Sequence, residues 1–310
     1  MIARNFGIEM ELADITQTQA LSALRSAGLR AEIEGYNHIA RPHWKIVTDS
    51  SVRNGFEVVS PILRGEHGLQ EAESAATALE TAGAKINTTC GLHVHFDAAG
   101  LEVNEIRTIA TRYAKHEAEI DAFMPRSRRG DANTYCKSTR RIFESAAFQS
   151  AETVDELIDA QGSRYFKLNL QSYRRHQTIE FRQHGGTVNA EKIHNWVYFL
   201  NGFITESRCR SRGCANLPTL KGAQAKLVSL LADEGRSADF LQETLNLLPH
   251  SLRAAISYLR RAGVGIESAR RNGQTIYRLA QGAAQVADTL FNGIDDSIRN
   301  FYSNRAAALA

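Results

Sequence analysis

Short segments of alternating hydrophobic and polar residues run through the first two thirds of the chain and predict strands. They lie at residues 6–12, 43–47, 56–59, 85–87, 92–96, 165–171 and 178–183. Helical periodicity occurs at residues 15–28, 67–83, 104–123, 153–160 and 190–206. Several strands follow one another without an intervening helix. This order predicts an α+β fold with a largely antiparallel sheet and flanking helices.

A different pattern begins after a linker that we place at residues 208–218. Three helical segments precede an alternating segment, at residues 222–232, 238–245, 249–262 and 265–279. Asn272-Gly273 stands at the centre of the last segment, and Asn-Gly favours the type I′ turn of a hairpin. Winged helix-turn-helix modules have this order of elements. We therefore expect a first domain at 1–207, such a module at 219–280 and a helical tail at 281–310.

Composition narrows the class of protein. The chain has 310 residues, 43% of them hydrophobic, which suits about two soluble domains. It has no run of about 18 apolar residues and no N-terminal segment typical of a signal peptide, so we expect no membrane insertion. The four cysteines form no C-x-x-C pair. We interpret them as reduced thiols of a cytoplasmic protein.

The net charge of +3 is unevenly distributed. Residues 1–216 are neutral, whereas residues 217–280 hold nine Lys and Arg against five Asp and Glu, a net charge of +4. This bias favours an anionic partner for the second module. DNA is the partner that a winged helix-turn-helix would suggest, and use of the module for protein contacts or domain packing is the alternative.

Three predicted strands carry pairs of ionisable residues at positions i and i+2, which point to the same face of a strand. The neighbours of each pair are apolar, so each strand has one core face and one charged face. The pairs are Glu9 and Glu11, His93 and His95, and Glu180 and Arg182.

Ionised groups on a buried sheet face are costly unless they have partners. A cleft that holds metal ions and a polyanion resolves this cost, since carboxylate oxygens suit Mg²⁺ and Arg182 suits a phosphate. The pattern therefore favours Mg·ATP chemistry. A metallohydrolase that binds Zn²⁺ through His93 and His95 is an alternative, but it leaves the two other strands unexplained.

The same segments resemble the motifs of the amidoligase family, whose members are similar to glutamine synthetase and glutamate–cysteine ligases. The resemblance extends over about residues 1–206 and implies a glutamine synthetase-like antiparallel sheet that holds ATP and divalent metal ions on one face. The segments that carry it are Phe6–Glu11, Trp44–Ser51, Glu57–Pro61, Cys90–Phe96, Tyr165 with Leu168–Leu170, and Thr178–Arg182 followed by Gly186-Thr187.

The resemblance implies a role for each matched residue. Glu9, Glu11 and Glu180 match metal ligands, and Glu57 matches a further acidic position in the metal or amine site. Arg182 matches a phosphate-contacting arginine. The remaining matches near the nucleotide or substrate are His93, His95, Asn169 and the basic pair Arg128 and Arg129.

The resemblance also implies a two-step reaction that uses ATP and Mg²⁺ or Mn²⁺. A substrate carboxylate first forms an acyl phosphate, and an amine then forms the amide, with Glu57 or Asp49 accepting its proton. The substrates are a carboxylate and an amine on a small molecule, a peptide or a protein side chain. One departure concerns Ser50, which stands where the family usually has glycine. We expect strain there if the loop requires a positive φ.

The C-terminal segment around Leu248–Ile256 resembles small bacterial winged-helix proteins. Its DNA-contacting candidates are arginines on the third helix and at the hairpin tip, namely Arg253, Arg260, Arg270 and Arg271. Two alternatives to a ligase stay open. One is an ATP-dependent phosphotransferase on the same scaffold, and the other is a DNA-binding regulator whose first domain senses a ligand.

Overall fold

The chain is described by a computed structural model that covers residues 2, 4–211, 227, 230–231, 235–245, 247–261, 266–271 and 273–279. Its contacts divide it into two compact units, Met1–Asn201 and Gly202–Ala310. In the described part of the chain, no helix has the length and apolar character needed to span a membrane.

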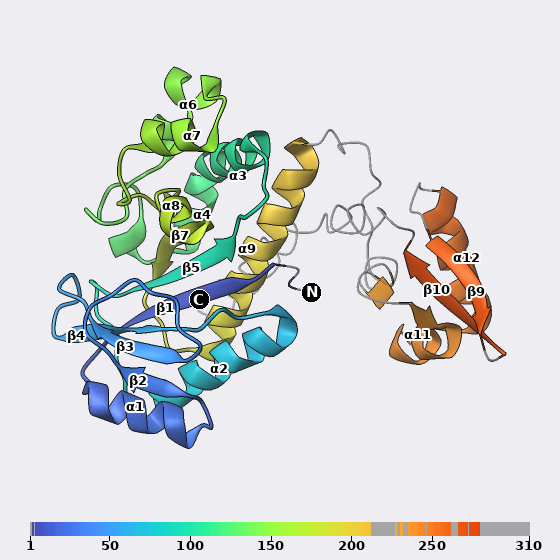
Figure 1. Cartoon of the computed structure of the whole chain (residues 1–310), viewed down its shortest axis with the longest axis horizontal. Coiled ribbons are helices and arrows are strands. Elements are labelled where there is room, and N and C mark those ends of the chain that lie inside the picture. The colour runs from blue at the N-terminus through green and yellow to red at the C-terminus, as the bar shows by residue number, and fades with distance from the viewer. Residues whose placement is uncertain are drawn as a thin grey trace. The chain divides into compact units, whose positions relative to one another are not determined.

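A seven-stranded sheet with the order β2-β3-β4-β1-β5-β7-β6 forms the centre of the first unit (Figure 1). β2 and β3 are parallel, and the other neighbouring strands are antiparallel. The predicted α+β class and largely antiparallel sheet are therefore confirmed. The strands are β1 (Phe6–Ala13), β2 (Ala31–Ile33), β3 (Trp44–Thr48), β4 (Gly55–Val59), β5 (Gly91–Asp97), β6 (Leu168–Asn169) and β7 (Thr178–Gly185).

Helices flank this sheet, with α1 beside β2 and β3 at one edge (Figure 1). Side-chain caps fix several helix starts; Thr16, for example, forms a capping box with Gln19 at the start of α1. The helical segments are α1 (Gln17–Ser26), α2 (Gly65–Thr81), α3 (Val103–Lys115), α4 (Glu117–Phe123), η1 (Arg126–Arg128), α5 (Arg140–Phe143), α6 (Ala146–Ser150), α7 (Val154–Gln161), α8 (Ser172–His176) and α9 (Ala190–Ser211).

The two faces of the sheet differ in chemistry. The side chains that β1 buries fully on its apolar face are Ile8, Met10 and Leu12. Helices α2, α3 and α9 cover this face and contact Trp44, Phe181 and His184, respectively. Each fully buried aliphatic side chain contributes about 1.5–3 kcal/mol to folding. The opposite face is left for polar groups.

Two short segments at the sheet differ from the prediction. The strand predicted at 85–87 is wrong, because Lys85 makes only an isolated bridge to Ala13. β2 was not predicted, since its three residues carry too little periodicity to be recognised.

Two predicted elements extend further along the chain than the elements in the structure. The strand predicted at 165–171 is shortened to Leu168–Asn169. The helix predicted at 104–123 is interrupted at His116, whose φ of −95° and ψ of 9° end α3 and begin α4.

The described part of the second unit contains a three-stranded antiparallel sheet of order β8-β10-β9 and two longer helices. A core that includes Leu231, Leu241, Leu252 and Ile256 joins them. The elements are β8 (Arg236–Ser237), α11 (Ala238–Leu245), α12 (Pro249–Arg261), β9 (Ile266–Arg271) and β10 (Gln274–Leu279).

The predicted hairpin is present, with Gln274 opposite Arg271 and Gly273 at a φ of +80°. Residues 208–211 belong to α9 rather than to a linker. The predictions that lie outside the described residues are most of the helix 222–232, the linker from 212 to 218, Asn272 and the tail 281–310.

Candidate functional site

Most of the predicted site residues meet on the polar face of the sheet because β1 lies between β4 and β5. The residues that stand opposite each other on neighbouring strands are Glu9 and His93, Glu11 and Glu57, and His95 and Glu180. Four strands therefore contribute ionisable side chains to one continuous patch, which we call the polar patch.

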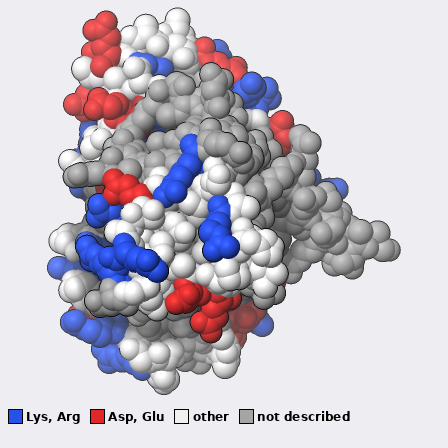
Figure 2. Space-filling view, turned by 90° about the vertical axis from the view of Figure 1, so that its right-hand side faces the viewer, with Lys and Arg blue, Asp and Glu red and all other residues white. Residues whose placement is uncertain are grey.

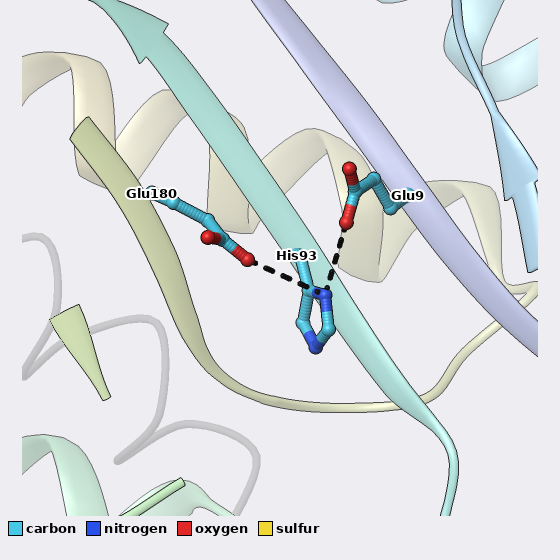
Figure 3. A group of neighbouring side chains, drawn as sticks. All are labelled: Glu9, His93 and Glu180. Carbon is cyan, nitrogen blue, oxygen red and sulfur yellow. Dashed lines mark hydrogen bonds and ion pairs between the residues drawn. The ribbon is translucent and has the colours of Figure 1, made fainter. Parts of the chain in front are cut away.

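Glu9, His93 and Glu180 form a first group whose ligand atoms all lie within 4.8 Å of one another. The side chains come from β1, β5 and β7 and point toward one another (Figure 3). His93 Nδ1 is 3.2 Å from Glu9 Oε2 and 3.6 Å from Glu180 Oε1. Two carboxylates and an imidazole at this spacing can hold a divalent cation.

Glu11, Glu57 and His93 form a second group by the same distance criterion. The Nε2 atom of His93 is 3.6 Å from Glu11 Oε1. His93 is thus shared by both groups, which makes the polar patch suitable for two neighbouring cations.

Two histidine nitrogens in the polar patch lack hydrogen bonds. Among the described residues, His93 Nε2 and His95 Nε2 are buried without a hydrogen-bond partner. Buried polar atoms normally have one, so these atoms indicate that a further group completes the site. A metal ion fits, because imidazole nitrogens and carboxylate oxygens are both metal ligands.

The carboxylates are electrostatically coupled. Burial raises the pKa of Glu57 well above its usual range, and Glu9, Glu11 and Asp49 raise it further. Burial also acts to raise the pKa of Glu9, but the neighbouring histidines outweigh it and hold the pKa well below the usual range. The polar patch therefore shifts the pKa values of these two carboxyls in opposite directions, a competition that bound cations would relieve.

His95 lies beside the first group, with Nε2 3.3 Å from Glu9 Oε1. Burial acts to lower its pKa, but the charges of Glu9 and Glu180 outweigh burial and raise the pKa above the ordinary value. Its Nδ1 pairs with the hydroxyl of Thr178 at 3.0 Å. In the absence of a bound cation, these two carboxylates thus favour the positively charged form of His95.

Two arginines reach the polar patch. Arg182 is ion-paired with Glu180 on the same strand. Arg128 is only 2% exposed, and its Nη2 lies 3.8 Å from Glu11 Oε2. The same nitrogen donates to the carbonyl of Thr89 at 3.0 Å. A buried and a half-buried guanidinium group beside carboxylates can attract an anionic ligand that is bound together with cations.

Gly91 leaves the space that Arg128 occupies. A Cβ at this position would lie 2.8 Å from Arg128 Nη2 and 2.9 Å from His93 Nε2. The backbone N–H of Gly91 also donates to Glu11 Oε2 at 2.5 Å. The glycine in the segment before His93 therefore allows an arginine and a histidine to share one small space.

Arg129 lies apart from these groups. Its Nε donates to the carbonyl of Met124 at 2.7 Å, and its Nη2 donates to that of Ala122 at 3.3 Å. The sequence analysis expected Arg128 and Arg129 to act together as a basic pair, but the short helix η1 brings only Arg128 into the polar patch.

Asn169 supports the polar patch from β6. Its Nδ2 donates to Glu180 Oε2 at 2.5 Å, and its Oδ1 accepts from the backbone N–H of Gln171 at 2.8 Å. The second bond fixes which way the amide points. Asn169 thereby orients the Glu180 carboxylate.

Asp49 lies in the loop that follows β3. Its Oδ1 accepts from both the backbone N–H and the hydroxyl of Ser51 at 2.7 Å. The prediction of strain at Ser50 is wrong, because Asn54, rather than Ser50, is the residue with a positive φ in this loop. Serine is therefore compatible with the loop.

A pocket of about 290 Å³ opens beside the first group, close to the lower size limit of small-molecule sites. Charged and apolar side chains line it together. They include Glu9, Lys45, His95, Ile39 and Ile62.

Sequence reasoning missed Lys45 as a site residue. Its Nζ donates to the carbonyls of Asn37 and Ile39, each at 3.0 Å, and to Asn37 Oδ1 at 3.1 Å. Lys45 thereby holds in place the loop around Asn37 and Ile39, which forms part of the pocket wall. The signal in the sequence was a lysine inside the apolar strand Trp44–Thr48.

Comparison with known proteins agrees with this chemistry. Residues 3–204 match the family model described as "Putative amidoligase enzyme". The match covers more than half of the chain, so the protein belongs to this amidoligase family. Among curated proteins, no relative matches the sequence.

Proposed function

We propose that this member of the amidoligase family is an ATP- and Mg²⁺-dependent ligase that joins a carboxylate to an amine through an acyl phosphate. Membership in the family supports an amide-forming ligase in general. The observation that carries the finer proposal is the pair of cation-binding groups that share one histidine beside two arginines. We also propose that the sheet is of the glutamine synthetase kind.

Divalent cations, Mg²⁺ or Mn²⁺, fit the two groups of the polar patch. When bound, they would neutralise the charge of ATP and polarise the transferred phosphoryl group. The residues that would hold them are Glu9, His93 and Glu180 in one group and Glu11, Glu57 and His93 in the other.

The pocket beside Glu9 and His95 is the proposed nucleotide site. It combines apolar walls for a base with cation ligands. A triphosphate bound between this pocket and the cations would approach Arg182 and Arg128, whose guanidinium groups suit phosphate oxygens.

In the proposed reaction, an oxygen of the substrate carboxylate attacks the γ-phosphorus, and the bond to ADP breaks. Arg182 and Arg128 would stabilise the charge of the transferred group. The amine nitrogen then attacks the acyl carbon, phosphate leaves, and the amine proton passes to Glu57 or Asp49. A carboxylate placed beside the amine is a suitable group for this proton transfer.

A zinc hydrolase that uses both strand histidines fits the geometry less well. Each described group in the polar patch contains His93 together with two carboxylates, and neither includes His95. A phosphotransferase would use the same residues as a ligase, and only the product distinguishes the two.

The ligase proposal is tested by measuring ADP release with Mg·ATP and a panel of carboxylates and amines. We expect release that depends on both substrates and forms an amide. Glu9→Gln keeps the size of the side chain but removes its charge, so we expect a loss of about 10³-fold in kcat. Full activity in Glu9→Gln would contradict the metal role, and phosphorylated product without amide would favour the phosphotransferase.

For the second unit we propose a winged-helix module that binds DNA. The observation that favours it is the exposure of Arg253 on α12 and of Arg270 and Arg271 at the end of β9. Figure 2 shows basic and acidic side chains together on one face of the molecule. The proposed contact would rest on a few arginines rather than on a uniformly basic surface, since residues 217–280 hold five Asp and Glu beside nine Lys and Arg. If the module binds DNA and the first unit binds ATP without turnover, the ligand-sensing regulator becomes the better description.

Arg260 has a different environment from the other three arginines. Its Nε donates to the carbonyl of Ile266 at 2.9 Å, and its Nη2 pairs with the hydroxyl of Ser268 at 3.2 Å. Arg260 thus joins α12 to β9, and we give it a structural contribution beside the proposed DNA contact.

A further inference from the structure

A buried charged network outside the two cation-binding groups is centred on Lys167. This side chain is 0% exposed, and its Nζ donates to Glu117 Oε1 at 3.0 Å and to both oxygens of Asp121 at 2.8 and 2.9 Å. A buried ion pair by itself is weak support for a stabilising role, because desolvation offsets much of the attraction. The hydrogen bonds that Glu117 and Asp121 accept from other segments say more about what the network does.

One arm of the network holds the loop that carries Arg128. Glu117 Oε2 accepts from both the backbone N–H and the hydroxyl of Thr139 at 2.7 Å. Asp121 Oδ2 accepts from the backbone N–H of Gly130 at 2.8 Å. The loop is thus attached beyond Arg128 at two points to α4, whose carboxylates the buried lysine holds in place.

The other arm holds an irregular part of β7. Phe181 pairs with Val94 and His184 pairs with Leu92, so two residues of β7 stand where β5 has only His93. Such a bulge changes the direction in which the side chains of these residues point, relative to a regular strand. The two residues are Arg182 and Gln183.

Both bulge residues are attached to the network. Gln183 donates from Nε2 to Asp121 Oδ1 at 2.6 Å and accepts from the hydroxyl of Tyr113 at 2.5 Å. The backbone N–H of Arg182 donates to the carbonyl of Lys167 at 2.7 Å. The bulge that aims Arg182 is thus attached to Asp121 through Gln183 and to the backbone of Lys167 through Arg182.

We propose that Lys167 is a positioning residue that aims both arginines of the polar patch, Arg128 and Arg182, at the phosphoryl group. It acts through Glu117 and Asp121 and touches no substrate itself. The inference rests on the proposed function, because its effect is exerted on the anion that these arginines would bind.

The test is Lys167→Met in the full chain, which removes the charge and leaves a side chain of similar length. We expect the variant to fold and kcat for ADP release to fall by about 10- to 100-fold, because small displacements of positioning groups cost this much. Folding is followed by the fluorescence of Trp44 and Trp196, which both lie in the first unit. A wild-type kcat in the folded variant overturns the proposal.

A double-mutant cycle with Arg128→Ala separates positioning from general stability. If Lys167 acts through Arg128, the loss caused by Lys167→Met should be clearly smaller in the Arg128→Ala background. Losses that multiply in full overturn the action through Arg128. If the wild type itself neither binds nor turns over ATP, the proposed function fails, and that result is obtained before any variant is made.

If Lys167→Met does not fold, two variants that each remove a single hydroxyl test the proposal instead. Thr139→Val removes a hydroxyl from one arm, and Tyr113→Phe removes a hydroxyl from the other. We expect each to lower kcat several-fold, whereas the control Thr77→Val removes an exposed hydroxyl bond within α2 and should leave kcat unchanged. Wild-type kcat in both arm variants overturns the proposal.

Discussion

The charged side chains proposed for function lie in opposite environments in the two units. In the first unit, Glu11, His93 and Arg128 are each less than 5% exposed and face one another across the sheet. In the second unit, Arg270 and Arg271 lie exposed on an outer strand. Buried charges have fixed positions and act strongly over short distances, whereas exposed charges are screened by solvent and salt.

This contrast indicates different kinds of function. A set of buried charges with fixed geometry can stabilise a transition state without reorganisation. A few exposed arginines suit association with a polyanion, which needs charge more than accurate geometry. The predictions below test this contrast, beginning with the largest expected effect.

Of these four predictions, Gly91→Ala should have the largest effect because it disturbs a crowded part of the polar patch. The added methyl would lie under 3 Å from the ends of Arg128 and His93, which must move away. We expect kcat for ADP release to fall by about 10²-fold. Gly35→Ala is the matched control, since its added methyl meets nothing within 4 Å. Equal activity of the two variants would show that the packing around Gly91 does not matter for turnover.

The second prediction concerns pH and the half-buried His184, which packs against Trp196 at 5.3 Å between ring centroids. Burial lowers the pKa of His184 to about 4 from an ordinary value of 6.5. The unfolded chain therefore takes up this proton first, and stability that is complete above pH 6.5 is lost as the pH falls toward 4. Between pH 7 and 5 we expect a loss of roughly 2 kcal/mol from this group.

Urea unfolding followed by tryptophan fluorescence measures this loss for the first unit. His184→Gln removes the titration, so its stability should fall less between pH 7 and 5 than that of the wild type. Identical pH dependence of the two proteins would mean that His184 is not held neutral by burial.

The third prediction concerns the wall of the pocket. Lys45→Met removes the three hydrogen bonds that hold Asn37 and Ile39 in place. We expect the KM for ATP to rise about 10-fold with a smaller change in kcat, because Lys45 lies in the wall rather than at the transferred group. A fall in kcat at constant KM would instead assign Lys45 to the chemical step.

The smallest effect is expected at the exposed arginines of the second unit. Replacement of Arg270 and Arg271 by Ala should weaken duplex DNA binding several-fold and reduce its salt dependence by one to two counterions, about one per lost phosphate contact. ADP release by the first unit should not change. Fluorescence anisotropy at several salt concentrations gives the slope, and absence of DNA binding by the wild type would reject the module's proposed partner.

The sequence alone determined the chemistry of the two faces of the sheet. Alternation around Glu9, His93 and Glu180 directed the charged side chains to one face, because successive residues of a strand point in opposite directions. The turn at Gly273 was likewise readable from a local rule. Such features depend on neighbours in the chain and therefore appear in the sequence.

Only the tertiary structure decided which of these side chains meet. Strand order and register place Glu9 opposite His93, and they depend on contacts between residues far apart in the chain. The choice of Arg128 over Arg129 depends on a single short turn, and the network around Lys167 joins α4, a loop and β7. No periodicity marks such groups, because each is a single polar residue whose partners are supplied by distant elements.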